Sequence, residues 1–377
     1  MSKEENRKNF SKYVSQNILG MIGFSCYVLA DSYFISIAKG ADGLTALNLV
    51  MPLYSIIFSI GEMIGVGSAI RYAISKIKKD ADADDYFWNA LIWCILSSML
   101  FVFAGIFFSA DIMRVLGADE HIVAVGNNYT KIFMCFAPMF MCNYVTNAFV
   151  RNDGAPGIAM SATLFSSLFN IVFDYILMFP MNLGMEGAAL ATALSPIIGM
   201  GICSIHFFSK KSSVRLVVCK PSVRKLVAGC QLGVSAFVGE MSSAVITLAF
   251  NFVILKLAGN VGVAAYGVVA NIAIVTTAVF NGVAQGSQPL ISSCFGRGDK
   301  DGCTQLKRMG YTTAFVLAAV MYSILFIFAG QFVAVFNSEG SEMLRLYATE
   351  GVKLYFIGIF FAGINIVGGG AFSATED

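Results

Sequence analysis

Long apolar segments dominate this chain of 377 residues and leave few folds open to it. Ten segments each hold the roughly 20 apolar residues that an α-helix needs to cross a hydrocarbon core. Hydrophobic residues make up 57% of the sequence, charged residues 13%, and the mean hydropathy is +0.73, whereas an average soluble domain carries about 25% charge. We therefore predict an all-α polytopic membrane protein, with spans at roughly 13–37, 46–70, 87–108, 121–149, 157–179, 185–208, 226–255, 263–293, 309–330 and 343–373.

The basic residues alternate along these spans. Of the 25 lysines and arginines, 19 fall in five alternate segments, which are 3–12, 71–79, Arg151, 210–225 and 297–308. The positive-inside rule places such segments in the cytoplasm, so we predict a cytoplasmic N-terminus and an even number of spans. Three prolines inside predicted spans, Pro52, Pro138 and Pro196, are candidate kinks.

A weak internal repeat divides the spans into six and four. A shift of 219 residues places 28–46 over 247–265 and aligns several small residues, namely Gly43 with Gly262, Ala46 with Ala265 and Gly67 with Gly286. A unit with an even number of spans repeats in the same orientation, which gives two pseudo-symmetric helical bundles about an axis along the membrane normal. We predict an N-lobe of six spans over 1–208, a cytoplasmic linker over 209–225 and a C-lobe over 226–377. The C-lobe then holds four spans of an expected six, and about 60 to 80 further residues would complete it.

A polar stripe crosses the fifth span. Thr163, Ser167, Asn170 and Asp174 follow one another at spacings of four, three and four, which is one face of an α-helix. A carboxylate at bilayer mid-depth costs roughly 2.5–3.5 kcal/mol on insertion scales and therefore seldom faces lipid. We interpret this stripe as one wall of a cation site inside a transporter.

Two further residues reach the same depth as the stripe. Asp31 lies about six residues from the outer end of its span, Asp174 about five and Thr192 about seven, so their depths agree within roughly 3 Å. Two carboxylates, the Asn170 amide oxygen and a hydroxyl are hard ligands that suit Na⁺ and do not suit soft metals. Two close carboxylates can also share a proton. The sequence does not separate Na⁺ from H⁺, and Asn170 and Thr192 favour Na⁺.

Other functional classes find little support. Nine cysteines show no paired spacing, and His121 and His206 are isolated, so disulfides and a transition-metal site are not expected. No serine–histidine or HExxH pattern in the spans indicates an intramembrane enzyme, and we expect no cofactor beyond a coupling ion.

Several motifs together resemble the MATE family, the multidrug and toxic compound extrusion transporters. They are ADSYF (30–34), ALNLVMPLYSIIF (46–58), RNDGAP (151–156), NIVFDYILMFPMNLGMEGAALATALS (170–195), AAYGVVANI (264–272) and GVAQGSQPLISSCFGRGDK (282–300). The resemblance implies two lobes that form a V around a central cavity, and the export of cationic, amphipathic drugs in exchange for Na⁺ or H⁺.

The resemblance also implies which residues carry the coupling ion. It assigns the N-lobe cation site to Asp31, Asn170, Asp174 and Thr192, and a possible C-lobe coupling residue to Glu240. The chain departs from the family where a proline near the start of helix one is replaced by Ser15 or a neighbour. It also departs at Asn365, where some members have an acidic residue.

We therefore predict a multi-pass secondary antiporter of the cell membrane that is a monomer. Its expected partners are membrane lipid and small organic cations or amphipathic drugs, and no nucleic acid. Alternative interpretations are a flippase for lipid-linked precursors, which would need a basic cavity, and a truncated fragment that does not transport. At the level of residues, Asn170 and Asp174 could serve only as polar contacts between helices. Glu240 could pack against Ser242 or Gln231, and Glu62 could be a structural or gating group.

Overall fold

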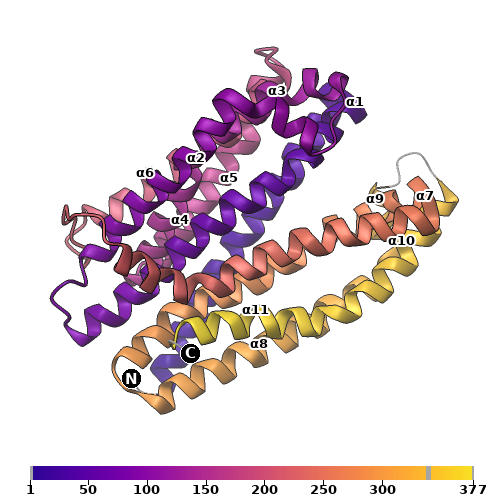
Figure 1. Ribbon diagram of the computed structural model, residues 1–377. Coiled ribbons are helices and arrows are strands. Elements are labelled where there is room, and N and C mark those ends of the chain that lie inside the picture. Colours follow the sequence, from indigo (N-terminus) through magenta and orange to yellow (C-terminus); the bar gives the residue numbers. More distant parts are fainter. Residues whose placement is uncertain (1–2, 337–340, 376–377) are drawn as a thin grey trace.

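The computed structural model describes residues 3–336 and 341–375, and all regular secondary structure among them is helical. A helix satisfies every backbone hydrogen bond within its own segment, as a chain in hydrocarbon requires. The helices form two bundles, which lie close together at the end that holds both termini and diverge toward the opposite end (Figure 1).

The N-lobe contains the first six helices. They are α1 (Lys3–Lys78), α2 (Asp85–Val115), α3 (Glu120–Cys135), α4 (Ala137–Asn152), α5 (Pro156–Met178) and α6 (Gly184–Phe207). The C-lobe contains α7 (Val223–Gly296), α8 (Lys300–Ile327), α9 (Ala329–Phe336), α10 (Glu342–Tyr355), the 3₁₀ turn η1 (Phe356–Gly358) and α11 (Ile359–Ser373). Polar N-cap residues precede several of the helices. Before α3, Asp119 accepts a hydrogen bond from the Ile122 amide (2.8 Å), and before α8, Asp299 accepts one from the Gly302 amide (2.8 Å).

Nine helices among the described residues are long and apolar enough to cross a membrane, and α3 and α4 form a tenth span if the bent pair is counted as one. This agrees with the ten predicted spans. The bend of 46° falls at Phe136, with Pro138 in the first turn of α4, as the proline predicted. Pro52 and Pro196 instead lie within helices that continue past them. Large apolar side chains such as Leu100, Phe107 and Phe361 are exposed on the outer faces, where lipid would cover them.

The first helix differs from the prediction at its start. The first predicted span begins near residue 13, whereas α1 is helical from Lys3 and runs without interruption to Gly40. Ser15 and its neighbours are part of this continuous helix.

Two single glycines turn the chain back on itself. α1 and α7 each consist of two spans joined at one residue in a left-handed conformation, Gly40 (φ 59°) and Gly259 (φ 61°), which only glycine adopts without strain. The two residues are 219 positions apart, which is the offset of the sequence repeat. The first parts of the two lobes therefore share one architecture, built around equivalent helical hairpins.

The lobes meet along a seam where these hairpins cross. A Cβ added to Gly233 of α7 would lie 2.0 Å from the Met63 carbonyl oxygen of α1, and one added to Gly67 would lie 2.0 Å from the Gly229 oxygen. On the other side of the seam, a Cβ on Gly286 would lie 2.7 Å from the Val14 Cα. Glycines spaced four apart, as at 229 and 233 or 282 and 286, allow membrane helices to approach this closely.

A non-helical segment over 208–222 connects the lobes. The buried carboxylate of Asp153, at the end of α4, accepts hydrogen bonds from the Ser213 amide (2.9 Å) and the Ser212 hydroxyl (3.1 Å) of this segment. His206 Nε2 lies 2.7 Å from the same oxygen. The linker is thus tied to the N-lobe beside the seam, next to the RNDGAP motif.

Candidate functional site

The polar stripe of α5 faces the interior of the N-lobe. Asn170 and Asp174 are fully buried (0% exposed), and so are Thr192 of α6 (2%) and Asp31 of α1 (6%). The structure therefore brings together the four residues that the sequence assigned to a cation site, from three helices, away from lipid.

Close packing of α5 against α6 places Thr192 opposite the stripe. A Cβ added to Gly187 of α6 would lie 2.7 Å from the backbone carbon of Leu177, so the two helices nearly touch. The Ser166 hydroxyl donates to the Ser195 carbonyl oxygen (2.6 Å) and ties the helices together again one turn from Thr192. These contacts explain why α6 carries small residues along this face.

Asn170 connects the carboxylate to the hydroxyl. Its side-chain amide lies 3.1 Å from the Thr192 Oγ1. In the amide orientation that satisfies both neighbours, Nδ2 donates to Asp174 Oδ2 (3.0 Å) and the amide oxygen accepts from the Thr192 backbone N–H (3.3 Å). Asn170 therefore fixes one oxygen of Asp174 and leaves the other free.

The free oxygens are the chemically important feature of this site. Oδ1 of Asp31 and Oδ1 of Asp174 are both buried and find no hydrogen-bond partner among the described residues. The two carboxyl groups are close enough to interact electrostatically. A buried carboxylate oxygen without a partner is costly, so each gains stability from a cation or a proton.

Tyrosines border the two carboxyl groups. Tyr27, Tyr54 and Tyr129 all interact electrostatically with Asp31 and Asp174, and the Tyr54 and Tyr129 hydroxyls lie 2.5 Å apart. None of these tyrosines was predicted from the sequence. Tyr27 lies one turn before Asp31, so helical spacing could have indicated it, whereas nothing in the sequence links Tyr54 to Tyr129.

The donor set fits Na⁺ or H⁺ and no transition metal. The available atoms are carboxylate, amide and hydroxyl oxygens, which are hard ligands. Within the part of the chain that the structure describes, no group of three or more His, Cys, Asp or Glu side chains is placed to hold a metal ion. Asp31, Asp174, Asn170 and Thr192 would be the residues that hold a coupling ion.

A second polar group lies at the seam between the lobes. Arg151 of α4 is buried (4% exposed), and its Nη1 donates to Gln285 Oε1 of α7 at 2.6 Å. Gln285 Nε2 in turn donates to Glu62 Oε1 of α1 at 3.4 Å. Glu240, from the first half of α7, interacts electrostatically with Glu62.

Glu240 therefore belongs to the seam and not to the N-lobe cluster. Its electrostatic neighbour is Glu62 of α1. Asn365 lies on an exposed face of α11. Sequence reasoning did not identify Arg151 or Gln285 as partners, although an arginine inside the RNDGAP motif was a visible signal.

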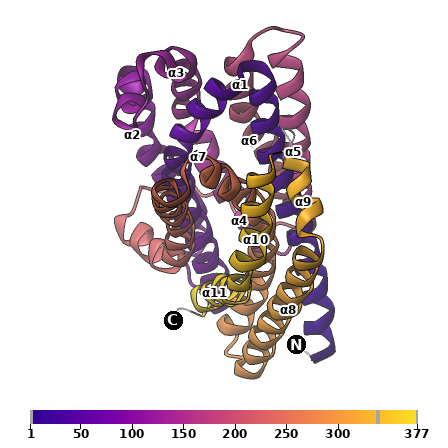
Figure 2. The ribbon, with the colours of Figure 1, turned by 90° about the vertical axis from the view of Figure 1, so that its right-hand side faces the viewer.

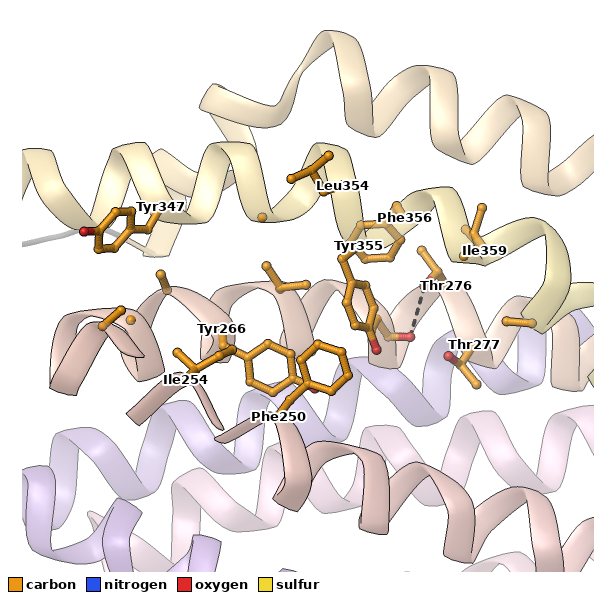
Figure 3. A pocket seen from close by; sticks show the side chains of 18 of the residues that line it. Phe250, Ile254, Tyr266, Thr276, Thr277, Tyr347, Leu354, Tyr355, Phe356 and Ile359 are labelled. Carbon is orange, nitrogen blue, oxygen red and sulfur yellow. Dashed lines mark hydrogen bonds between the residues drawn. The ribbon is translucent and has the colours of Figure 1, made fainter. Parts of the chain in front are cut away.

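The C-lobe holds an apolar cavity of about 650 Å³ between α7 and the α10–α11 segment (Figure 3). Aromatic rings line it; Phe250 and Tyr266 stack with their centroids 5.3 Å apart, and Tyr355 meets both rings edge-on. Its few polar side-chain atoms are the hydroxyls of Thr276, Thr277 and three tyrosines (Tyr266, Tyr347 and Tyr355), and the Thr276 hydroxyl donates to the Ala273 carbonyl (3.0 Å). This cavity suits the apolar part of a molecule better than an ion.

Two helical lobes that share a seam, with a buried polar site in one of them, are the architecture of a multi-pass membrane transporter. The family model described as MatE matches residues 17–176 and 236–377, so the chain belongs to the MatE family.

Similar proteins support this assignment. The multidrug export protein MepA of Staphylococcus saprophyticus subsp. saprophyticus is 25% identical over 365 residues, which cover 95% of this chain and 79% of that protein. MepA of Staphylococcus aureus (strain MRSA252) is 27% identical over 336 residues, or 88% and 72%. Among solved structures, the outward-facing conformation of a multidrug resistance MATE family transporter of the MOP superfamily superposes with a TM-score of 0.90 at 20% identity, over 98% of this chain and 83% of that one.

Proposed function

We propose that this protein is a secondary antiporter of the plasma membrane that exports amphipathic, cationic drugs or other toxic organic compounds in exchange for Na⁺ or H⁺. The names of its relatives, multidrug export proteins, support the class of substrate. The basic segments favour a cytoplasmic N-terminus, which places the seam at the cytoplasmic end and the divergent end of the lobes outside.

One observation carries the coupling mechanism. Two buried carboxyl groups, Asp31 and Asp174, each keep one oxygen without a hydrogen-bond partner among the described residues. A bound ion or proton lowers the cost of burying them, so its arrival changes the relative free energies of the two facing states. Asn170 and Thr192 would complete the oxygen shell of Na⁺, and the tyrosine hydroxyls lie near enough to respond to its charge.

Neutralising either carboxyl group tests the proposal. We expect Asp31→Asn and Asp174→Asn each to reduce ethidium efflux from cells to the level of cells without the protein. The single remaining carboxyl group should not bind and release the coupling ion well enough to drive transport. Efflux would be measured by fluorescence at matched membrane expression, with and without sodium.

Asp42→Asn is the matched control. Asp42 is an exposed carboxylate on the second half of α1, where it lies 2.9 Å from His121 Nε2, and its loss should leave efflux within about twofold. Efflux at the wild-type rate in both buried-site variants would contradict the proposal.

A further inference from the structure

At the seam between the lobes, the side chain of Gln285 reaches from the C-lobe to partners in the N-lobe. Gln285 lies on the second half of α7, whereas its two partners, Arg151 and Glu62, both belong to the N-lobe. Its amide oxygen faces the guanidinium and its NH₂ group faces the carboxylate. The amide dipole is therefore aligned between a positive and a negative group, which stabilises both contacts.

Arg151 depends on this contact. A guanidinium that is 4% exposed needs acceptors, and its Nη1 has two, Gln285 Oε1 at 2.6 Å and Asn17 Oδ1 at 3.4 Å. Both acceptors are neutral amides, and the shorter bond comes from the opposite lobe. Gln285 also connects Arg151 to a negative charge, because the amide that accepts from Arg151 donates to the Glu62 carboxylate.

The surroundings exclude most water. The cavity lined by Asn17, Arg151 and Gln285 has a volume of about 10 Å³, room for roughly one water molecule. Gly282, about one turn before Gln285 on α7, and Gly286, the residue after it, hold the backbones of the two lobes in contact. The Arg151–Gln285–Glu62 bridge thus lies in a closely packed part of the seam, where an electrostatic contact is strong.

We propose that Gln285 is a positioning residue of the transport cycle, whose amide latches the two lobes together by bridging Arg151 and Glu62 in the conformation described here. When the lobes part at the seam, Gln285 leaves with the C-lobe. Arg151 then loses its shortest hydrogen bond, and the guanidinium and the Glu62 carboxylate face each other within one lobe. The latch favours the state in which the seam is closed, and its loss favours the state in which the seam is open.

The frequency of seam opening can be measured without knowing the substrate. Leu232 lies on α7, is 5% exposed and packs into the hydrophobic core of the N-lobe, so Leu232→Cys places a thiol that water reaches only when the lobes separate. The rate at which a water-soluble maleimide modifies this thiol, followed by peptide mass spectrometry in lipid nanodiscs, reports the open population. Site-resolved detection leaves the nine native cysteines in place.

In this background we expect Gln285→Leu and Gln285→Asn to raise the rate of modification roughly 10- to 100-fold, as the loss of a hydrogen bond to a charged group predicts. Gln285→Asn keeps the polarity of the seam but shortens the side chain, so it separates loss of the bridge from misfolding. The rise caused by Gln285→Leu should be smaller when Glu62→Gln is also present, because one end of the bridge is then already weakened.

Gln288→Leu is the matched control. Gln288 is also buried, lies one turn further along α7 and contacts Gly370 of the C-lobe, so its loss should leave the rate unchanged. The proposal is overturned if both Gln285 variants are modified within twofold of the reference rate, or if Gln288→Leu raises the rate equally. Neither outcome depends on a coupling ion or a drug, so the result is independent of the proposed antiport.

Discussion

The two lobes are built on the same hairpin but have different interiors. At the offset of 219 residues, the position of Asp31 in the N-lobe is occupied by Phe250 in the C-lobe, and that of Leu47 by Tyr266. In the N-lobe, Ile35 and Leu47 pack against Met178 of α5 and Met185 of α6. In the C-lobe, the equivalent Ile254 and Tyr266 line an open aromatic cavity, and no counterpart of α5 and α6 occurs among the described residues.

This difference teaches that the repeat preserves backbone geometry and not chemistry. The glycine turns and the close contacts at the seam recur in both halves, because they are set by helix packing. Among the described residues, Asp31 has Asp174, Asn170 and Thr192 near it because α5 and α6 supply them. The proposed coupling ion would meet carboxylate, amide and hydroxyl oxygens in the N-lobe, whereas the described C-lobe residues at the equivalent positions line an apolar cavity. α5 and α6 lie against α1 in the N-lobe, whereas α10 and α11 lie against α7 in the C-lobe (Figure 2).

The largest expected effect comes from moving the acid between lobes. Asp31→Asn should abolish efflux, and adding Phe250→Asp in the same protein should not restore it, because no described partner equivalent to Asn170 or Asp174 lies beside Phe250. Ethidium efflux from cells, at equal expression, measures both variants. Recovery of transport in the double variant would show that the C-lobe can host the ion, and the contrast between the lobes would fail.

A smaller effect should separate the two halves of the seam. Gly233→Ala places a methyl group 2.0 Å from the Met63 carbonyl oxygen, whereas Gly286→Ala places one 2.7 Å from the Val14 Cα. Overpacking costs about 1–3 kcal/mol, and we expect Gly233→Ala to lower the thermal unfolding midpoint in detergent more than Gly286→Ala. Gly267→Ala, with nothing within 4 Å of the new Cβ, is the control and should not lower it. Equal midpoints for the first two variants would mean that both halves of the seam tolerate an added methyl group equally, which would contradict this prediction.

The smallest effect concerns the identity of the ion. Thr192→Val removes one hydroxyl ligand from the N-lobe site and should raise the sodium concentration for half-maximal transport roughly 3- to 10-fold, the value of one neutral hydrogen bond. Thr276→Val makes the same change in the C-lobe cavity and should leave the sodium requirement as it is. Transport would be assayed in proteoliposomes at fixed pH. If Thr192→Val changes the dependence on pH and not on sodium, the proton is the coupling ion.

The sequence predicts most of the architecture because apolar length and helical spacing are local properties. The predicted spans agree with the helices to within a few residues at most ends, and the bend near Pro138 falls as expected. The start of α1 was not predicted, because the first span was expected to begin near residue 13, whereas the helix begins at Lys3 and the contacts of 3–12 are not visible in the sequence. Asn6 and Gln305, for example, are joined by a hydrogen bond between distant parts of the chain (3.3 Å).

The candidate site was predictable only in part. Asp31, Asn170, Asp174 and Thr192 could be identified because buried acids and amides are rare in membrane spans. The bridge from Arg151 through Gln285 to Glu62 could not, because Gln285 is 134 residues from Arg151 and 223 from Glu62. Such a contact depends on how the two lobes dock, which no periodicity within either lobe encodes.

The single-residue turns at Gly40 and Gly259 have a further consequence for how the molecule moves. Each turn ties the far ends of two spans, and at the near end each leg of one hairpin presses against the opposite leg of the other, Val14 on Gly286 and Met63 on Gly233. Because one residue joins the two legs of each hairpin, we expect that one leg cannot move away without the other. Separation of the near ends should therefore break both helix contacts together, so the hairpins should be either in contact or apart, without a stable intermediate.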